Sequence, residues 1–228
     1  MTPPATGTKT GTTRARSSKK ANRQAEVTQA AIEIFWQKGY RSASIQDVAD
    51  KVGVLKGSLY YYIDSKEDLL WRVIEDVHEE WSEILQEAGK LDAGPIERIH
   101  AFIKLHIEWY LTNVKEVSVF FREWQHLSGD RLKTVRARRR RYEQVIRDLI
   151  TEGQAAGDIS SALDDHYAAR YVLAAVNAVP YWYRASSGES PATIAEAYAN
   201  MTVGMLRGTT TLDQSTSTRR PSSSSSVD

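Results

Sequence analysis

The stretch from Ser44 to Leu70 reads SIQDVADKVGVLKGSLYYYIDSKEDLL, and it decides the fold. A helix-turn-helix needs a small residue where its two helices cross, a glycine in the tight turn and apolar inner faces. Ala49 supplies the small residue, and Gly53 follows four positions later. The apolar residues at inward positions are Val48, Val52, Val54, Leu59 and Tyr62. Because these spacings agree, we predict a helix-turn-helix, with an ordinary helical hairpin as the alternative.

The ends of the helices in this stretch carry their own signals. Ser44 is a suitable N-cap for the first motif helix, with Asp47 three residues later, and Ser65 is a suitable N-cap for a long helix. The second motif helix is predicted around residues 56–63 and holds three consecutive tyrosines, 60–62. Adjacent helical residues point about 100° apart, so the three rings cannot share one buried face. Some of them must be exposed, where tyrosine can contact phosphates, sugars or thymine methyl groups; burial is the competing interpretation for Tyr62.

The chain on both sides of this stretch has helical periodicity almost throughout. Before it, apolar residues from Val27 to Phe35 form one stripe, and Gly39 is expected to end that helix. No stretch alternates with period two. We therefore predict an all-α protein of about nine helices: an N-terminal three-helix helix-turn-helix domain and a larger helical domain. The further helices are expected at residues 65–89, 95–110, 115–127, 130–156, 164–186 and 191–206.

Composition divides the 228 residues into four segments. The first 23 residues hold six Lys and Arg and no acidic residue, and the last 20 are mostly Ser and Thr. Such segments cannot bury a core, so both are expected to be disordered. The predicted segments are a basic arm (1–22), a helix-turn-helix domain (23–70), a larger domain (71–208) and a Ser/Thr tail (209–228).

The remaining composition excludes several classes of protein. The chain has no cysteine, which excludes disulfide scaffolds, thiol catalysis and Cys-based zinc sites. Mean hydropathy is −0.46 and no long apolar run occurs, which excludes a membrane protein. The net charge of +1 conceals a division. Residues 1–70 hold eleven Lys and Arg against seven Asp and Glu, a net +4, and the rest of the chain carries −3.

Together with Ala31, Phe35, Gly39 and Tyr40 in the preceding helix, the opening stretch resembles the N-terminal signature of TetR-family transcriptional regulators. The resemblance implies a cytoplasmic, homodimeric, ligand-responsive repressor that binds a pseudo-palindromic operator in double-stranded DNA. It implies no cofactor, no metal and no membrane partner. Leu55 departs from the pattern, because the family usually has Ser or Thr there as a helix cap. Leu55 is expected either to contact apolar groups of DNA or to pack inward.

The resemblance also implies which side chains meet DNA. Ser44 and Lys66 would hold phosphates. Gln46 and Lys56 would face base edges, and Gly57 would let the backbone approach the duplex. The full implied set is Ser44, Gln46, Lys56, Gly57, Ser58, Tyr60, Tyr61 and Lys66. For the basic arm, minor-groove contact and a non-contacting tail both stay open.

The larger domain gathers aromatic residues on more than one helical face, which indicates a core stripe, a pocket or a partner surface. In the resembled family this domain holds a small-molecule cavity. Five arginines lie between Arg136 and Arg141; they form either a solvated face with pairs such as Arg139–Glu143 or a phosphate or carboxylate site. An effector with apolar and anionic parts, such as an acyl-CoA thioester, would use both features. The predicted ligand-binding residues are Trp109, Phe120, Phe121, Arg122, Trp124, Arg170, Asn177 and Trp182.

The larger domain is also similar in layout to family members that regulate lipid and steroid (cholesterol) catabolism. The last two helices of the resembled family form a dimer bundle, for which the chain offers small residues, methionines and tyrosines. The residues suited to that interface are Tyr167, Tyr171, Ala174, Ala175, Ala178, Ile194, Ala197, Tyr198, Met201, Gly204 and Met205.

Two other functional classes, an enzyme and a protein-binding adaptor, fit the sequence less well. An enzyme is not expected, because no nucleophile elbow, metalloprotease motif or phosphate loop occurs. His100 and His106 are six residues apart, which places them on separate helical faces and makes a two-histidine metal site unfavourable. A helical adaptor that binds proteins without DNA is the second alternative, which the three tyrosines and Lys66 argue against.

Overall fold

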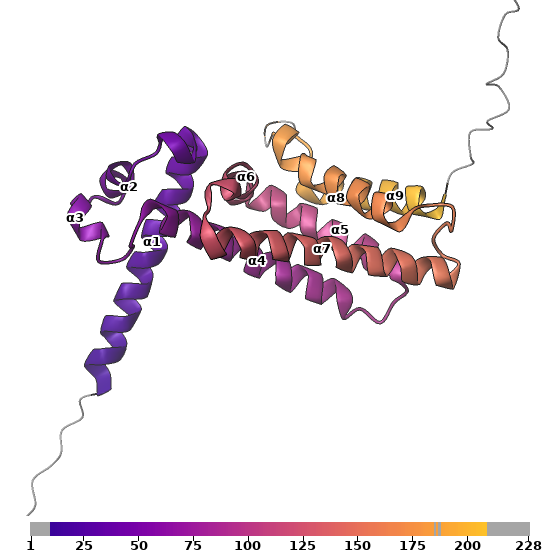
Figure 1. Cartoon of the computed structure of the whole chain (residues 1–228), viewed down its shortest axis with the longest axis horizontal. Coiled ribbons are helices and arrows are strands. Elements are labelled where there is room, and N and C mark those ends of the chain that lie inside the picture. Colours follow the sequence, from indigo (N-terminus) through magenta and orange to yellow (C-terminus); the bar gives the residue numbers. More distant parts are fainter. Residues whose placement is uncertain (1–9, 185, 187, 209–228) are drawn as a thin grey trace, which may run out of the picture.

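The computed structural model describes residues 10–184, 186 and 188–208 (Figure 1). Over these residues it contains nine α-helices, one short 3-10 helix and no strand, so the all-helical prediction is confirmed. No helix in this part of the chain is long and apolar enough to cross a bilayer. The elements are α1 (Thr10–Ser42), α2 (Ile45–Val52), α3 (Lys56–Leu59), α4 (Lys66–Gly89), α5 (Pro95–Thr112), α6 (Val114–Glu123), η1 (Trp124–His126), α7 (Gly129–Ala156), α8 (Asp165–Trp182) and α9 (Pro191–Arg207).

The predicted helix caps in the opening stretch are present. The Ser44 hydroxyl accepts from the backbone N–H of Asp47 at 3.1 Å, and the Asp47 carboxylate accepts from the backbone N–H of Ser44 at 2.8 Å. This reciprocal pair is a capping box, which fixes the start of α2. Gly53 ends α2 with φ +74°, a conformation that glycine adopts without a Cβ clash. Ser65 caps α4 by accepting from Asp68.

The second motif helix is shorter than predicted. It ends at Leu59, and residues 60–62 form a turn in which Tyr62 donates to the carbonyl of Leu59 at 2.8 Å. Leu55 stands at its N-cap and provides no side-chain hydrogen bond, so one orphan donor of the helix has no side-chain partner. Because Gly57 also lowers helix propensity, a single turn is all that forms. Likewise, α8 ends at Trp182, four residues before the predicted end.

The prediction for the N-terminal arm is corrected by the structure. The sequence predicts a disordered segment at residues 1–22, but α1 already begins at Thr10. Its first half lacks proline and is rich in Ala, Arg and Lys, which propagate a helix readily from the turns that follow. Gly39, the predicted end, is a non-helical break (φ +74°) before α1 resumes to Ser42. Residues 1–9 and the Ser/Thr tail lie outside the described residues.

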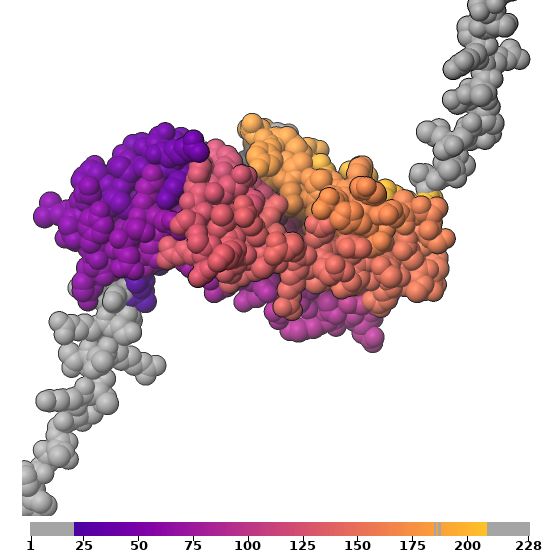
Figure 2. Space-filling view, viewed as in Figure 1, coloured from indigo at the N-terminus to yellow at the C-terminus, as the bar shows by residue number. Residues whose placement is uncertain are grey.

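The helices form two lobes (Figure 1). One lobe contains α1, α2, α3 and the start of α4, and α4 continues into the other, where α5 packs against α4, α7, α8 and α9. Phe35 and Leu59 are fully buried in the first lobe, as are Phe102 and Tyr110 in the second. Each such side chain contributes about 2 kcal/mol on burial. Figure 2 shows α6 and the start of α7 directly against the first lobe.

Candidate functional site

The outer face of α2 and α3 is a polar and aromatic surface held on a buried apolar face. Val48, Ala49 and Leu59 are fully buried on the inner side, as their spacing predicted. Tyr60 and Tyr61 are 50% and 70% exposed on the outer side. Seven of the eight residues predicted to meet DNA are exposed, namely Ser44, Gln46, Lys56, Gly57, Ser58, Tyr60 and Tyr61. The start of α2, the short helix α3 and the turn after it thus carry these residues at one end of the molecule (Figure 1).

Two positions of this surface have local features that bear on their expected roles. Leu55 is 80% exposed, so inward packing, one of its two expected arrangements, does not occur. At Gly57 a Cβ atom would meet nothing within 4 Å, so the protein itself does not require glycine there.

Lys66 is the one predicted DNA-contacting residue that is partly buried. Its ammonium donates to the backbone carbonyl of Arg41 at 3.3 Å and lies 4.4 Å from the centroid of the Tyr40 ring. Burial lowers the pKa of Lys66, although Asp47 and Glu123 oppose that effect. The ammonium still has hydrogens left for a phosphate, since it donates up to three bonds.

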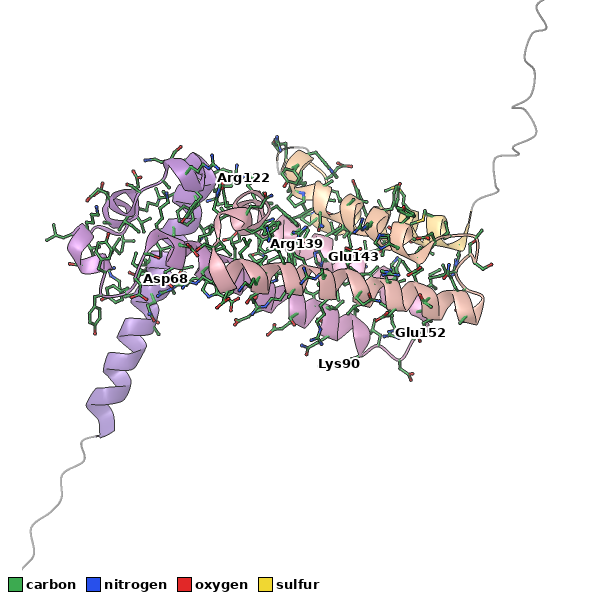
Figure 3. The ribbon with its side chains drawn as sticks, viewed as in Figure 1. Asp68, Lys90, Arg122, Arg139, Glu143 and Glu152 are labelled. Atoms are coloured by element: carbon green, nitrogen blue, oxygen red, sulfur yellow. The ribbon has the colours of Figure 1, made fainter. Side chains whose placement is uncertain are left out.

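We expect Lys66→Ala to weaken binding to every DNA sequence and to lower the salt slope by about one, because one phosphate contact is lost. Binding titrations at several salt concentrations measure both quantities. Lys90→Ala is the control, since Lys90 is exposed at the far end of α4 (Figure 3). An unchanged salt slope in Lys66→Ala would contradict the phosphate contact.

The second lobe contains a cavity of about 950 Å³ lined by residues of α4, α5, α6, η1, α7 and α8. Its aromatic residues pack against one another; Tyr110, for example, meets Phe121 edge to face with ring centroids 5.8 Å apart. The aromatic residues of the lining are Trp81, Tyr110, Phe121, Trp124 and Tyr142. The arginines of α7 belong to the same lining. The cavity therefore combines a large apolar surface with several positive charges.

The arginines of α7 differ in their partners. Arg138 forms an ion pair with Glu75, and Arg139 lies 5.0 Å above the ring of Trp124. The expected Arg139–Glu143 pair is not formed, because Glu143 accepts from Arg170 at 3.0 Å instead. Three further arginines line the cavity on exposed positions and have no ion pair with a residue that the structure describes, namely Arg136, Arg140 and Arg141.

The structure brings half of the predicted ligand-binding residues to this cavity: Phe121, Trp124, Arg170 and Asn177. Phe120 is fully buried in the core, and Trp109 is partly buried and packs against the core. Arg122 donates to the carbonyl of Trp36 at 3.0 Å, and Trp182 stacks on Tyr198. For Phe120 and Trp109 the reason is rotational: adjacent residues of one helix face directions about 100° apart, and it is their neighbours Phe121 and Tyr110 that line the cavity.

Sequence reasoning did not assign Tyr110, Tyr142 and His78, which also line the cavity, to the ligand site. The Tyr110 hydroxyl donates to Asn177 at 2.9 Å, and the Tyr142 hydroxyl lies 2.6 Å from Nδ1 of His106. His78 also lines the cavity, one turn before Trp81. The available signal was the spacing of three or four residues that puts His78 beside Trp81 and His106 beside Tyr110 on one helical face.

Burial keeps two of these histidines neutral. It lowers the pKa of His78 to about 4, with the charges of Arg138 and Arg139 acting in the same direction. It lowers the pKa of His106 to about 3. In both cases the unfolded chain binds a proton below about pH 6.5, whereas the folded protein binds it only near its lower pKa. The free energy of unfolding therefore falls as the pH drops below 6.5, and it stops falling below the folded pKa.

We expect His78→Phe to reduce this loss by about 2 kcal/mol between pH 7 and pH 5, since the ring shape is kept and the titrating group removed. Nε2 of His78 has no hydrogen-bond partner among the described residues, so phenylalanine breaks no bond there. Urea unfolding of both proteins at the two pH values measures the difference. The same loss in both would show that His78 does not contribute.

Comparison with protein families agrees with the architecture of both lobes. Residues 27–73 match the family of bacterial regulatory proteins described as tetR family, and residues 92–206 match the tetracyclin repressor-like C-terminal domain. The chain belongs to the TetR family. As a member it is a DNA-binding transcriptional regulator and not an enzyme, and the resemblance seen in its helix-turn-helix is confirmed.

Individual relatives of this TetR-family chain are distant. It is 24% identical to the HTH-type transcriptional repressor KstR2 of Rhodococcus jostii over 195 residues, 83% of this chain and 94% of the relative. The structure of the ketosteroid transcriptional regulator KstR2 of Mycobacterium tuberculosis has a TM-score of 0.77 at 22% identity, covering 81% of this chain and 94% of that one. AibR in complex with isovaleryl coenzyme A and operator DNA has a TM-score of 0.71 at 24% identity, covering 81% and 97%.

Proposed function

We propose that the chain is a homodimeric transcriptional repressor whose effector is an acyl-CoA thioester of lipid or steroid catabolism. The observation that carries the proposal is the cavity of the second lobe, whose lining combines aromatic side chains with the arginines of α7. Binding of the thioester there would favour a dimer geometry that fits a pseudo-palindromic operator less well.

Exposure of the α2–α3 surface supports the operator contact. In this proposal Lys56 and Gln46 face base edges in the major groove, and Tyr60 and Tyr61 lie along the groove wall. The Gln46 amide donates one hydrogen to Asp50 at 2.7 Å, which leaves its second N–H and its carbonyl oxygen for a base. Ser44 and Lys66 hold phosphates and so fix the register of the motif.

The outer face of α8 and α9 supports the dimer. The two helices lie side by side at one edge of the second lobe (Figure 1), and both expose apolar side chains. Tyr171 and Met201 are 65% and 61% exposed, which an isolated soluble surface rarely tolerates in one patch. Ile194, also expected at the interface, is buried within its own protomer. The exposed members are Tyr167, Tyr171, Ala174, Ala178, Ala197, Met201 and Gly204, which we call the α8–α9 face.

The mixture of aromatic and cationic residues in the cavity lining supports the effector class. An acyl chain would pack on the aromatic residues. The phosphates of coenzyme A would meet the exposed Arg136, Arg140 and Arg141, because forked guanidinium groups suit phosphate. Related regulators point the same way, because AibR has been crystallised with isovaleryl coenzyme A and KstR2 is named as a ketosteroid regulator.

A gel shift with the DNA upstream of the chain's own coding region tests the proposal. The protein should bind this DNA, and an acyl-CoA ester should release it where the corresponding free acid does not. Isothermal titration of both compounds should give binding of the ester alone. Equal or absent binding of the ester and the acid would overturn the acyl-CoA assignment, and absence of a shift on any upstream fragment would overturn the role in autoregulation.

A further inference from the structure

We propose that the cavity selects an acyl group that carries a hydrogen-bond-accepting oxygen, and that Arg139 binds this oxygen. The inference rests on the effector class proposed above and specifies the part of the thioester that enters the protein. It separates the α7 arginines into two roles. The exposed ones meet the phosphates, and Arg139 reads the acyl group.

Arg139 is a half-buried cation without an acidic partner. Its guanidinium lies over the ring of Trp124, and it forms no ion pair or hydrogen bond with a residue that the structure describes. Burial lowers its pKa, and this outweighs the opposing effects of Tyr110, Tyr181 and Glu143. A guanidinium has five N–H donors, and leaving them partly buried with no acceptor from the protein costs free energy in the ligand-free state.

Two nitrogen atoms of residues that line the same cavity also have no partner among the described residues: Nε2 of His78 and Nε1 of Trp81. Both residues line the cavity, and their side chains are 9% and 5% exposed. The charge of Arg139 reaches His78, since it contributes to lowering the pKa of that histidine. The indole N–H of Trp81 can only donate.

Two acceptors of the lining are already engaged. Oδ1 of Asn177 accepts from the Tyr110 hydroxyl, and Oε1 of Glu143 accepts from Arg170 and lies 3.6 Å from His166. The cavity therefore holds two donors without a partner among the described residues, the indole N–H of Trp81 and the guanidinium of Arg139, while its exposed residues Glu79, Ser82 and Gln86 carry further acceptors. A ligand that complements it must bring an acceptor, which a carbonyl or carboxylate oxygen supplies and a saturated hydrocarbon chain does not.

The unpaired donors predict that the cavity discriminates between ligands with and without an acceptor oxygen. A site built to hydrogen-bond its ligand rejects the analogue that lacks the bonding atom, because the polar groups of the protein are then buried unpaired. Figure 3 labels Arg139 on the stretch of α7 that passes alongside α8, with Glu143 one turn further along. The cavity of about 950 Å³ has room for a ring bearing such an oxygen.

Two matched ligand pairs test the inference by isothermal titration with the full chain. The first pair is cyclohexylpropanoyl-CoA and its analogue with a ketone on the ring carbon opposite the side chain. The second is octanoyl-CoA and suberyl-CoA, which has the same chain length and ends in a carboxylate. We expect the oxygenated member of at least one pair to bind about tenfold or more tightly than its partner, and the pair that responds identifies ketone or carboxylate.

Variants then assign the preference to Arg139. In Arg139→Met and Arg139→Gln the ratio of the two affinities within the responding pair should fall toward one. Two variants are used so that a folding defect in one of them does not decide the result. The matched control is Arg140→Met, the exposed neighbour, which should weaken both members equally and keep the ratio.

The outcomes separate this inference from the proposed function. If no thioester binds or releases DNA, the acyl-CoA assignment itself fails. If the thioesters bind but both pairs show equal affinities, only the oxygen preference is overturned. If the preference exists and persists in both Arg139 variants, the oxygen is read by another residue and the role of Arg139 is overturned.

Discussion

Replacing Tyr171 and Met201 together by Glu should leave a folded monomer that binds the operator at least about 100-fold more weakly. Both side chains are largely exposed in the protomer, so its fold does not depend on them. In a dimer built on the α8–α9 face the four introduced carboxylates would be buried close together, which costs several kcal/mol. A monomer reaches one half-site only and loses the gain of about 10²–10⁴ that linked binding provides.

Analytical ultracentrifugation measures the oligomeric state, and a gel shift measures the affinity. The control is the double variant Lys90→Gln with Leu91→Glu, which changes the net charge by the same amount at exposed positions away from α8 and α9 (Figure 3). It should stay dimeric and bind normally. If the Glu variant remains a dimer, the interface lies elsewhere. If it becomes a monomer with full affinity, dimerisation is not required for binding.

The helix-turn-helix could be predicted in detail because its determinants are local. The capping box at Ser44 and the turn glycine Gly53 depend on residues a few positions apart, and the structure has both. The length of α3 could not be predicted, because the apolar periodicity continues through Tyr62 while the missing cap at Leu55 limits the helix. The arm illustrates the opposite error, since its composition resembles a disordered tail and yet α1 begins at Thr10.

The cavity was half predictable because its lining depends on the rotation of each helix about its axis. Aromatic clusters at 120–124 indicated the region, but periodicity does not distinguish Phe120, which enters the core, from Phe121, which lines the cavity. Tyr142 and Trp81 come from α7 and α4, whose relative placement is a tertiary property. Pairings such as Arg170 with Glu143 join residues on two helices and have no signature in either one.

The same dependence on tertiary contact applies to Asp68, which joins the two lobes. This carboxylate is 7% exposed and accepts from Arg72 at 2.9 Å and from Arg131 at 3.0 Å. Arg72 also donates to the carbonyl of Tyr62, at the end of the turn that follows α3. Arg131 lies in the first turn of α7, the helix whose later turns line the cavity. Asp68 thus connects, through Arg72 and Arg131, the turn after α3 to the first turn of α7.

We expect Asp68→Ala to lower the free energy of unfolding by about 3 kcal/mol, the lower end for removing one partner of a buried ion pair, since both arginines stay partly exposed to water. We also expect it to reduce the effect of the effector on DNA affinity, because the contact between α4 and α7 is weakened. Urea unfolding measures the first quantity, and operator titrations with and without the acyl-CoA ester measure the second.

Asp130→Ala provides the matched control, because Asp130 is also an aspartate in the first turn of a helix but is 94% exposed and pairs with Lys133, itself 79% exposed. Water screens such a pair, so its loss should change stability by less than about 1 kcal/mol and leave the coupling intact. A stability loss in Asp68→Ala with undiminished effector response would show that Asp68 holds the lobes together without transmitting the signal. Equal stability of the two variants would show that the Asp68 pairs are no stronger than the surface pair.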